Sequence, residues 1–270
     1  MDKLTALHPE IERLFFETYS KKNSSDESRI LKTKQVMGYI EKLVEITSPK
    51  HIAVVGCGPA PSTIKALETM GHKAVGIEPE QEYVESANDY LSGCGRVAIG
   101  QCESMRVADE SFDIIFCESV LEHVDSPEKS MDEFYRVLKP GGIVYIVTEN
   151  NLRFSLTGRN NEFNKRYYNW YPRSVKEGYI KLHLNKKPWL ANYTPLPAVH
   201  WYTFASLCRL GRYAGFGKFY SILDVIDEND PRVKKLIGGK IVLRWIKNNP
   251  WLRALMLRQV GTTIFMYKRK

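Results

Sequence analysis

The feature that most constrains the fold is a run of alternating strand and helix patterns between residues 51 and 149. Five short apolar segments read as strands: HIAVVG, KAVGIE, RVAIGQ, FDIIFCE and GGIVYIVTE. Three segments with helical spacing of apolar residues lie between successive strands, at 61–70, 80–91 and 128–137. Short strands that alternate with helices are typical of a parallel sheet covered on both faces. The sequence therefore predicts a doubly wound α/β core.

Segments on both sides of this core have different patterns. Residues 9–20 and 27–46 read as amphipathic helices, and we expect them to cover the sheet edge. After the core, the pattern predicts a helix over 203–214, a strand over 219–225, one or two helices over 232–258 broken at Asn248-Asn249-Pro250, and a last strand in GTTIFMYKRK. We expect four parts: a helical cover over 1–48, a core over 49–150, a lid insertion over 151–200 and the C-terminal part of the core over 201–270.

The segment VVGCGPAP, Val54–Pro61, lies between the first strand and the first helix of the core. Gly56 and Gly58 allow a tight turn and close contact with a ligand, because a Cβ at either position would fill that space. A dinucleotide fingerprint, GxGxxG, needs glycine at position 61, where this chain has proline. The spacing GxGxG needs glycine at position 60, where this chain has alanine. The chain therefore departs less from GxGxG than from GxGxxG.

Glu78 ends the next strand, 20 residues after Gly58. A carboxylate at this place can accept hydrogen bonds from both hydroxyls of a ribose. NAD sites and S-adenosylmethionine sites share this feature. The two motifs together therefore predict a ligand that contains adenosine, without deciding between these two.

Four ordered pieces cover roughly residues 50–150: VVGCGPA, AVGIEP, IGQCESM and SFDIIFCESVLEHVDSPEKSMDEFYRVLKPGGIVYIVTEN. With them the chain resembles the class I methyltransferases of quinone biosynthesis and of many sugar, lipid and natural-product pathways. The stretch from LEHV to YRVLKPGG is the most specific part, and it is not a feature of dinucleotide dehydrogenases. The resemblance implies a Rossmann-like seven-stranded methyltransferase sheet with an antiparallel last strand. To this sheet the sequence pattern adds an N-terminal helical cover, an aromatic and basic lid insertion, and a C-terminal helical insertion before the last strand.

The resemblance also implies that the cofactor is S-adenosyl-L-methionine. The residues that it places at the cofactor are Val55, Gly56, Cys57, Gly58 and Pro59 in the first loop, Glu78 and Pro79 at the ribose, Gln101, Cys102 and Glu103 near the adenine, and Cys117 and Glu118 beside the methionine moiety. Ala60 departs from the family pattern, and so does Gln101, where an aspartate often contacts the adenine amino group. Glutamine can still accept that hydrogen bond through its amide oxygen. We therefore expect weaker binding rather than loss of binding.

Methyl transfer from a sulfonium is an in-line displacement, so the protein mainly aligns the acceptor with the methyl carbon. A hydroxyl acceptor also needs a base. His200, in PAVHWYTF, and His123, in LEHV, are the candidates for base or substrate-orienting group, and His183 is a weaker one. His123 has the alternative role of a structural histidine. The five cysteines show no CxxC or Cys/His spacing, so neither a disulfide framework nor a metal site is expected.

Charge and aromatic residues are unevenly distributed along the chain. Residues 151–270 hold 23 Lys and Arg against 6 Asp and Glu, whereas residues 1–150 hold 16 against 25. The aromatic cluster FNKRYYNWY over 163–171 can stack on a flat acceptor or form a small core beneath a loop. The run over 232–258 mixes two tryptophans with Lys and Arg, which is typical of an interfacial membrane helix, although it can equally pack on the sheet. The basic half is expected to face an anionic partner, or simply to be solvated.

Our leading hypothesis is an O-methyltransferase that acts on a small-molecule, glycan or lipid-linked acceptor, with phosphate on the acceptor or a membrane surface nearby. No signal peptide or membrane span is recognisable, so we expect a cytoplasmic protein, in peripheral contact with the inner membrane face. Two alternatives stay open. One is an RNA methyltransferase. The fourth strand argues against it, because this strand ends in CESV rather than in the Pro-Pro motif of base-amino methyltransferases. The other is an inactive methyltransferase-fold subunit that binds a partner. The sequence leaves the oligomeric state open.

Overall fold

A computed structural model describes residues 26–93, 95–148, 166–172, 174–176, 178–179, 200–259 and 262–269 of the chain. Its strands are β1 (His51–Val55), β2 (Lys73–Glu78), β3 (Arg96–Ile99), β4 (Phe112–Glu118), β5 (Leu138–Thr148), β6 (Lys218–Ser221) and β7 (Thr262–Tyr267). Its helices are α2 (Asp26–Glu41), α3 (Ser62–Thr69), α4 (Gln81–Leu91), α5 (Pro127–Val137), η1 (Tyr168–Trp170), α7 (Phe204–Tyr213), α8 (Ile222–Val225), α9 (Pro231–Lys234), α10 (Gly239–Asn248) and α11 (Pro250–Gln259). The helix expected over 9–20 lies outside the described residues.

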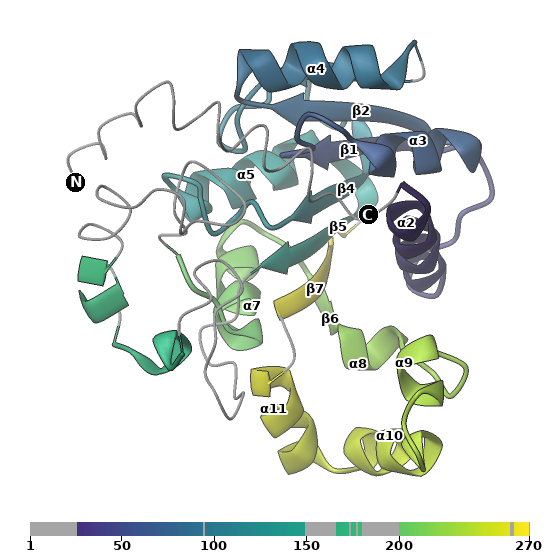
Figure 1. Cartoon of the computed structure of the whole chain (residues 1–270), viewed down its shortest axis with the longest axis vertical. Helices are drawn as coiled ribbons and strands as arrows, with labels where there is room; N and C mark the ends of the chain where they lie inside the picture. The colour runs from purple at the N-terminus through teal and green to yellow at the C-terminus, as the bar shows by residue number, and fades with distance from the viewer. Residues whose placement is uncertain are drawn as a thin grey trace.

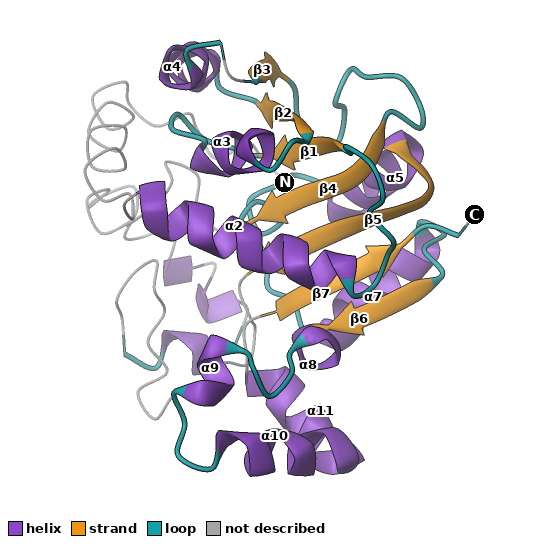
Figure 2. Cartoon of the chain, turned by 90° about the vertical axis from the view of Figure 1, so that its right-hand side faces the viewer, coloured by secondary structure: helices purple, strands orange, loops and turns teal. Residues whose placement is uncertain are grey.

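One seven-stranded sheet organises these elements, in the order β3-β2-β1-β4-β5-β7-β6. Strands β1 to β5 pair in parallel, and β7 runs antiparallel to both β5 and β6. The α/β class, the seven strands and the antiparallel last strand are thus confirmed. Figure 2 shows helices on both faces of the twisted sheet.

Alternate residues of each central strand enter two separate hydrophobic clusters. On β1, Ile52 and Val54 belong to the cluster beneath α2, α3 and α4, whereas Ala53 and Val55 face the cluster beneath α5 and α7. Successive side chains of a strand point to opposite faces of a sheet, so a strand buried on both sides must be apolar throughout. This explains the continuous apolar runs in the sequence.

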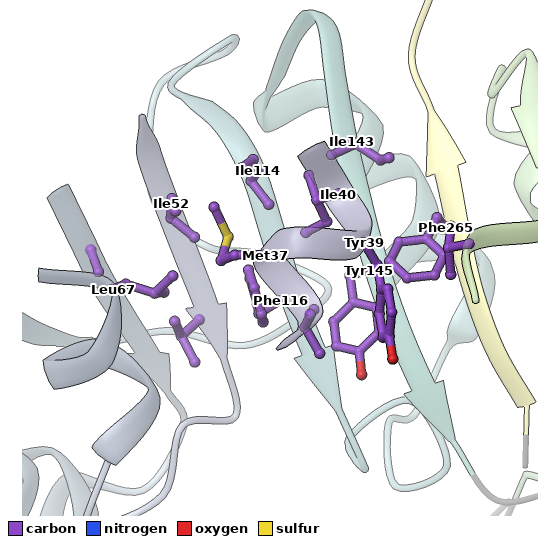
Figure 3. Packing of buried hydrophobic residues seen from close by; sticks show 14 of the residues in the cluster. Met37, Tyr39, Ile40, Ile52, Leu67, Ile114, Phe116, Ile143, Tyr145 and Phe265 are labelled. Carbon is purple, nitrogen blue, oxygen red and sulfur yellow. The ribbon is translucent and has the colours of Figure 1, made fainter. Parts of the chain in front are cut away.

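Helix α2 lies across the middle of the sheet rather than over its edge, which corrects the sequence-based expectation. Met37 and Ile40 are completely buried, and Figure 3 shows them above β1 and β4, close to Ile114 and Phe116. The helix ends at Glu41 instead of residue 46. Its apolar side therefore forms the cover of the central strands.

The segment after α7 also differs from its prediction. Strand β6 ends at Ser221 instead of residue 225, because Ser221 begins helix α8 as part of a capping box with Asp224. The backbone nitrogen and the hydroxyl of Ser221 both donate to Asp224 Oδ2 over 2.7 Å. A capping box satisfies helix-terminal donors, so it outweighs the β-type apolar pattern of Ile222–Val225.

Residues 231–259 form a helical C-terminal lobe made of α9, α10 and α11. Both views place this lobe beyond the β6 end of the sheet, away from α3 and α4 (Figures 1 and 2). The predicted break between two helices is confirmed, since α10 ends at Asn248 and α11 begins at Pro250. Proline lacks a backbone N–H and suits the first turn of a helix, which sets the boundary.

Candidate functional site

The candidate site lies where the parallel strands end. Val55 of β1 pairs with Ile77 of β2 and with Cys117 of β4. Because parallel strands share a carboxyl edge, the residues that follow these positions lie side by side. The two sequence motifs are brought together in this way: Gly56 N–H donates to the Ile77 carbonyl over 2.8 Å, and Glu78 comes next on β2. Ligands of open α/β sheets bind at this edge.

The glycine loop has a backbone shape that side chains would not allow. Gly56 and Gly58 have φ of 62° and 67°, in the left-handed region that favours glycine. A Cβ on Gly56 would lie 2.2 Å from Cγ2 of Val120, which follows β4. Ala60 has φ outside the left-handed region, so the loop has no conformational need for a third glycine there. The departure from GxGxG is therefore accommodated.

Glu78 is buried, with 5% of its surface exposed, and its carboxylate lies against the glycine loop. Its Oε2 accepts a hydrogen bond from Gly58 N–H over 2.9 Å. Burial raises the pKa of Glu78 to about 7, although backbone hydrogen bonds from Gly58 and Glu80 oppose this rise. A carboxylate with a second oxygen at this edge can accept from further hydroxyl donors.

The segment predicted near an adenine, Gln101 to Glu103, forms a tight turn after β3. Backbone hydrogen bonds between Gln101 and Ser104 close the turn. Gln101 is exposed, whereas Cys102 is buried. Glu103 Oε1 accepts from the backbone N–H groups of Asp125 and Ser126, over 2.9 and 3.1 Å. Gln101 is therefore the member whose side chain is open to solvent, while Glu103 holds the loop before α5 in place.

Two cysteines of the site are packing residues. The Sγ atom of Cys57 would lie 2.7 Å from a Cβ placed on Gly76, so it fills the space above that glycine. Burial, with a smaller contribution from Glu78, raises the pKa of the Cys57 thiol. A hydrogen bond with Cys102 and complete burial raise the pKa of Cys117. Neutral thiols are poor nucleophiles and poor metal ligands. Within the described ranges, no group of three His, Cys, Asp or Glu residues is placed to hold a metal ion.

Two carboxylates, at the end of β4 and shortly after it, lie on the other side of the site. Lys32 of α2 forms a 2.8 Å ion pair with Glu118, which is the last residue of β4. Glu122 is buried, and Thr148 Oγ1 at the end of β5 donates to its Oε2 over 2.7 Å. The cover helix and the two strand ends are thus linked through polar contacts at the edge.

His200 and His123 both belong to this side. His200 N–H donates to the Glu122 carbonyl over 3.1 Å, and His200 Nε2 lies 3.0 Å from the Val124 carbonyl oxygen. A carbonyl can only accept, so Nε2 carries the proton and Nδ1 is the basic nitrogen of the ring. His123 is half-buried and closes the turn after β4 by donating its N–H to Val120. His183 lies outside the described residues.

Several residues of the site escaped the sequence-based prediction. Ser119 has a φ of 56°, and its N–H donates to Val147 over 2.7 Å. Neither this backbone conformation nor the contact between Gly56 and Val120 has a sequence signal, because both arise between segments far apart in the chain. The hydrogen bond between Glu122 and Thr148 has no sequence signal for the same reason. Of the insertion that the sequence predicts as a lid, residues 151–200, the part around Tyr168 is described, and Tyr168 is completely buried. Most of this segment lies outside the described residues.

Comparisons with known proteins agree with this geometry. A family model described as a methyltransferase domain matches residues 53–146. The ubiquinone biosynthesis O-methyltransferase of Idiomarina loihiensis is 29% identical over 127 residues, which cover 45% of this chain and 52% of that protein. The sterol 4-C-methyltransferase strm-1 of Caenorhabditis elegans is 27% identical over 120 residues, covering 42% of this chain and 36% of that protein.

Similarity in structure extends further along the chain than similarity in sequence. A SAM-dependent methyltransferase of Thermotoga maritima, a possible histamine N-methyltransferase, superposes with a TM-score of 0.53. The match covers 96% of this chain and 99% of that one, at 16% sequence identity. The likeness in fold therefore extends over 96% of the chain, whereas its sequence matches span about half or less of the curated relatives.

Proposed function

We propose that the chain is a class I S-adenosylmethionine-dependent methyltransferase and that it methylates an oxygen atom of a small-molecule, glycan or lipid-linked acceptor. The observation that carries the cofactor part is the joint geometry of Gly56, Gly58 and Glu78 at one strand edge. The oxygen atom rests on the similarity to an O-methyltransferase. The relatives also include a sterol C-methyltransferase, so the fold alone does not determine the accepting atom.

The residues present fit S-adenosylmethionine. Because Gly56 has no Cβ, Val120 packs directly against the glycine loop, and the loop keeps the left-handed backbone that favours glycine. Glu78 is a buried carboxylate that suits the two hydroxyls of a ribose, and Gln101, two residues after the end of the neighbouring strand β3, is exposed. When bound, the cofactor supplies a methyl group that its sulfonium charge has already activated. The chain must then orient the acceptor and exclude water.

On the acceptor side, His200 supports the choice of oxygen. An alcohol or phenol loses its proton as it attacks, so it needs a base within hydrogen-bond reach. Nε2 of His200 is fixed by the Val124 carbonyl, which leaves Nδ1 as the nitrogen that takes the proton. The Glu122 carbonyl accepts from the backbone N–H of His200, and the Glu122 carboxylate accepts from Thr148, so Glu122 links His200 to the end of β5.

Calorimetric titration with S-adenosylhomocysteine tests the cofactor site. Gly56→Ala should weaken binding at least about a hundredfold, because its Cβ would overlap Val120 and a positive φ is unfavourable for alanine. Gly38→Ala is the matched control, since nothing lies within 4 Å of a Cβ at that position. Equal affinity in both variants and the wild type would refute the site. Binding without any methyl transfer would favour an inactive subunit.

The pKa of Glu78 allows a second test with 5′-methylthioadenosine, which lacks the amino-acid part of the cofactor. Ribose hydroxyls donate to the ionised carboxylate, whereas the free protein holds a proton on Glu78 below about pH 7. Affinity should therefore rise as the pH rises through about 7, with release of a proton. In Glu78→Gln the affinity should be lower and independent of pH. A wild-type affinity that falls with rising pH would contradict this role.

A methyl-donor consumption assay tests the acceptor. Sugar-phosphate, polyprenyl-linked, quinone-like and tRNA acceptors would be compared, and turnover with a hydroxylated small molecule or lipid is expected. His200→Gln should lower kcat about a hundredfold or more while the affinity for S-adenosylhomocysteine stays unchanged. Turnover that is confined to tRNA would establish the RNA methyltransferase instead. An unchanged kcat in His200→Gln would exclude this histidine as the base.

A further inference from the structure

The C-terminal lobe, residues 231–259, exposes large apolar side chains that a water-facing surface does not normally gather. Seven of them lie on three short segments of the lobe: Leu236, Ile237, Ile241, Val242, Trp245, Trp251 and Leu255. The exposed fractions reach 76% for Ile241 and 87% for Trp251. Single exposed apolar residues are ordinary, whereas a contiguous group marks a contact surface.

The exposed residues of α10 lie on the side opposite to its packed side. Ile241 and Trp245 are spaced by four residues, which places them in one row along the helix, and Ile237 is exposed in the turn that precedes it. The buried residues, Gly239 and Leu243, lie half a turn away and face the rest of the protein. Helix α10 is therefore already packed on one side and still presents a second apolar row to solvent.

Positive charge surrounds these rows. Residues 231–259 contain eight Lys and Arg and no Asp or Glu. Some of these charges pair with carboxylates that precede the lobe, as Arg244 does with Glu228 and Arg253 with Asp224. Lys234 and Lys235 are exposed and form no ion pair with any described residue. The lobe thus combines an apolar surface with a surplus of positive charge.

We propose that the C-terminal lobe docks the protein on the surface of an anionic lipid bilayer. Tryptophan and aliphatic side chains suit the boundary between headgroups and acyl chains, and Lys and Arg attract anionic headgroups. None of the described helices is long and apolar enough to cross a bilayer. The contact is therefore peripheral, with the apolar rows of α10 and α11 entering the interface.

Charge and chemistry favour a bilayer over other partners. A second copy of the chain would bring an identical basic lobe, and like charges at an interface repel. Single-stranded RNA is bound by aromatic stacking on bases, whereas most of the exposed apolar residues of the lobe are aliphatic. Ile237, Ile241 and Leu255 have no role in base stacking and suit acyl chains.

Flotation of the full chain with vesicles tests the proposal. Vesicles of phosphatidylcholine with phosphatidylglycerol should carry the protein upward, and vesicles of phosphatidylcholine alone should carry much less. The double variant Ile241→Ser/Trp245→Ser should lose most of this binding. Leu31→Ser/Tyr213→Ser is the matched control, because these side chains are 70% and 83% exposed outside the lobe. The control should float like the wild type, and equal loss in both double variants would overturn the proposal.

Charge is tested in the same assay. Lys234→Gln/Lys235→Gln should weaken binding to the anionic vesicles about tenfold, since each cation near such a surface contributes. Lys34→Gln/Lys73→Gln removes the same charge elsewhere and should have a much smaller effect. Affinity for S-adenosylhomocysteine reports the folding of every variant and is expected to stay constant. Because this titration also tests the proposed function separately, loss of flotation and loss of cofactor binding are distinguishable.

Tryptophan quenching by brominated lipid locates the contact. Phenylalanine keeps the apolar character, so Trp245→Phe/Trp251→Phe should still float but should lose most of the quenching seen in the wild type. Quenching that persists in this variant would place the contact outside the lobe and overturn the proposal. Two other outcomes would also do so: salt-sensitive retention of RNA without flotation, or a dimer that Ile241→Ser/Trp245→Ser dissociates.

Discussion

Helices α2 and α10 both present apolar residues at helical spacing, yet one row is buried and the other is exposed. Met37 and Ile40 of α2 are 0% exposed above the central strands, whereas Ile241 and Trp245 of α10 are 76% and 63% exposed. The first row covers a sheet that would otherwise face water. The second lies on a helix whose packing against the protein is already provided by another side. An apolar row therefore indicates that one side of a helix packs against another surface. Only the fold shows whether this surface lies within the protein.

The largest expected effect is on the buried row. Met37→Ala should lower the free energy of unfolding by about 2–5 kcal/mol, because it leaves a cavity above β1 and β4. Urea unfolding measures the change. Leu31→Ala, on an exposed position of the same helix, should cost well under 1 kcal/mol. Similar losses in both variants would mean that α2 does not cover the sheet.

Two glycines sharpen the comparison, because alanine should have opposite effects on the two helices. At Gly239 a Cβ would lie 2.1 Å from the carbonyl oxygen of Val233, so Gly239→Ala should destabilise the lobe by about 1–3 kcal/mol. At Gly38 there is open space, and Gly38→Ala should stabilise α2 by up to about 1 kcal/mol. Amide hydrogen exchange within α10 and α2 measures each change. Faster exchange in α2 after Gly38→Ala would contradict the described packing.

A smaller effect is expected where α2 meets the start of the lobe. The Tyr39 hydroxyl donates to Asp230 and accepts from Arg232 Nη2 over 2.7 Å. Tyr39→Phe should therefore cost about 1–2 kcal/mol in urea unfolding. Removing the ring as well, in Tyr39→Ala, should cost clearly more, because the ring belongs to the buried cluster. Equal stability of wild type and Tyr39→Phe would show that the hydroxyl contributes nothing.

The same contact predicts how the free energy of unfolding depends on pH. Burial opposes ionisation of Asp230, but hydrogen bonds from Arg232 and Tyr39 outweigh it and lower its pKa from 3.8 to about 2. A carboxyl group whose pKa is lower in the folded chain than in the unfolded chain stabilises the fold at pH values above its unfolded pKa. This contribution is lost as the pH falls toward the folded pKa. The stability difference between wild type and Asp230→Asn should therefore shrink between about pH 4 and pH 2. A difference that grows on acidification would refute this assignment.

The smallest effect is expected on the exposed row. Ile241→Ala should change the free energy of unfolding by less than about 0.5 kcal/mol, because the side chain makes little contact within the protein. Thermal unfolding without vesicles measures it. Leu243→Ala, one of the buried positions of the same helix, should destabilise the lobe measurably. A large loss in Ile241→Ala would mean that this row is part of the core.

The sequence predicted the core well because its signals are local. Each parallel strand is a continuous apolar run, and Gly56, Gly58 and Glu78 lie within 23 residues of one another. The sheet type, the glycine loop and the acidic residue after β2 could all be predicted from such short segments. The antiparallel last strand came from the family resemblance instead of from a local pattern.

Features that depend on distant segments could not be predicted. Glu103 resembles a cofactor residue in sequence, yet its carboxylate caps backbone groups 22 and 23 residues further on. Helix α8 begins inside a β-type pattern because one aspartate completes a capping box. The exposure of Trp245 was equally undecided, since its pattern suits packing on the sheet and contact with a membrane alike.

The position of the lobe within the chain makes it an insertion between two neighbouring strands. It lies in the connection between β6 and β7, two antiparallel neighbours whose register starts with Ser221 opposite Ile264. Antiparallel neighbours need only a short turn to join them, and the entropy of closing a connection grows slowly with its length. The exposed part of the lobe is therefore exchangeable, because a shorter or different connection between β6 and β7 would leave the strand order of the sheet unchanged.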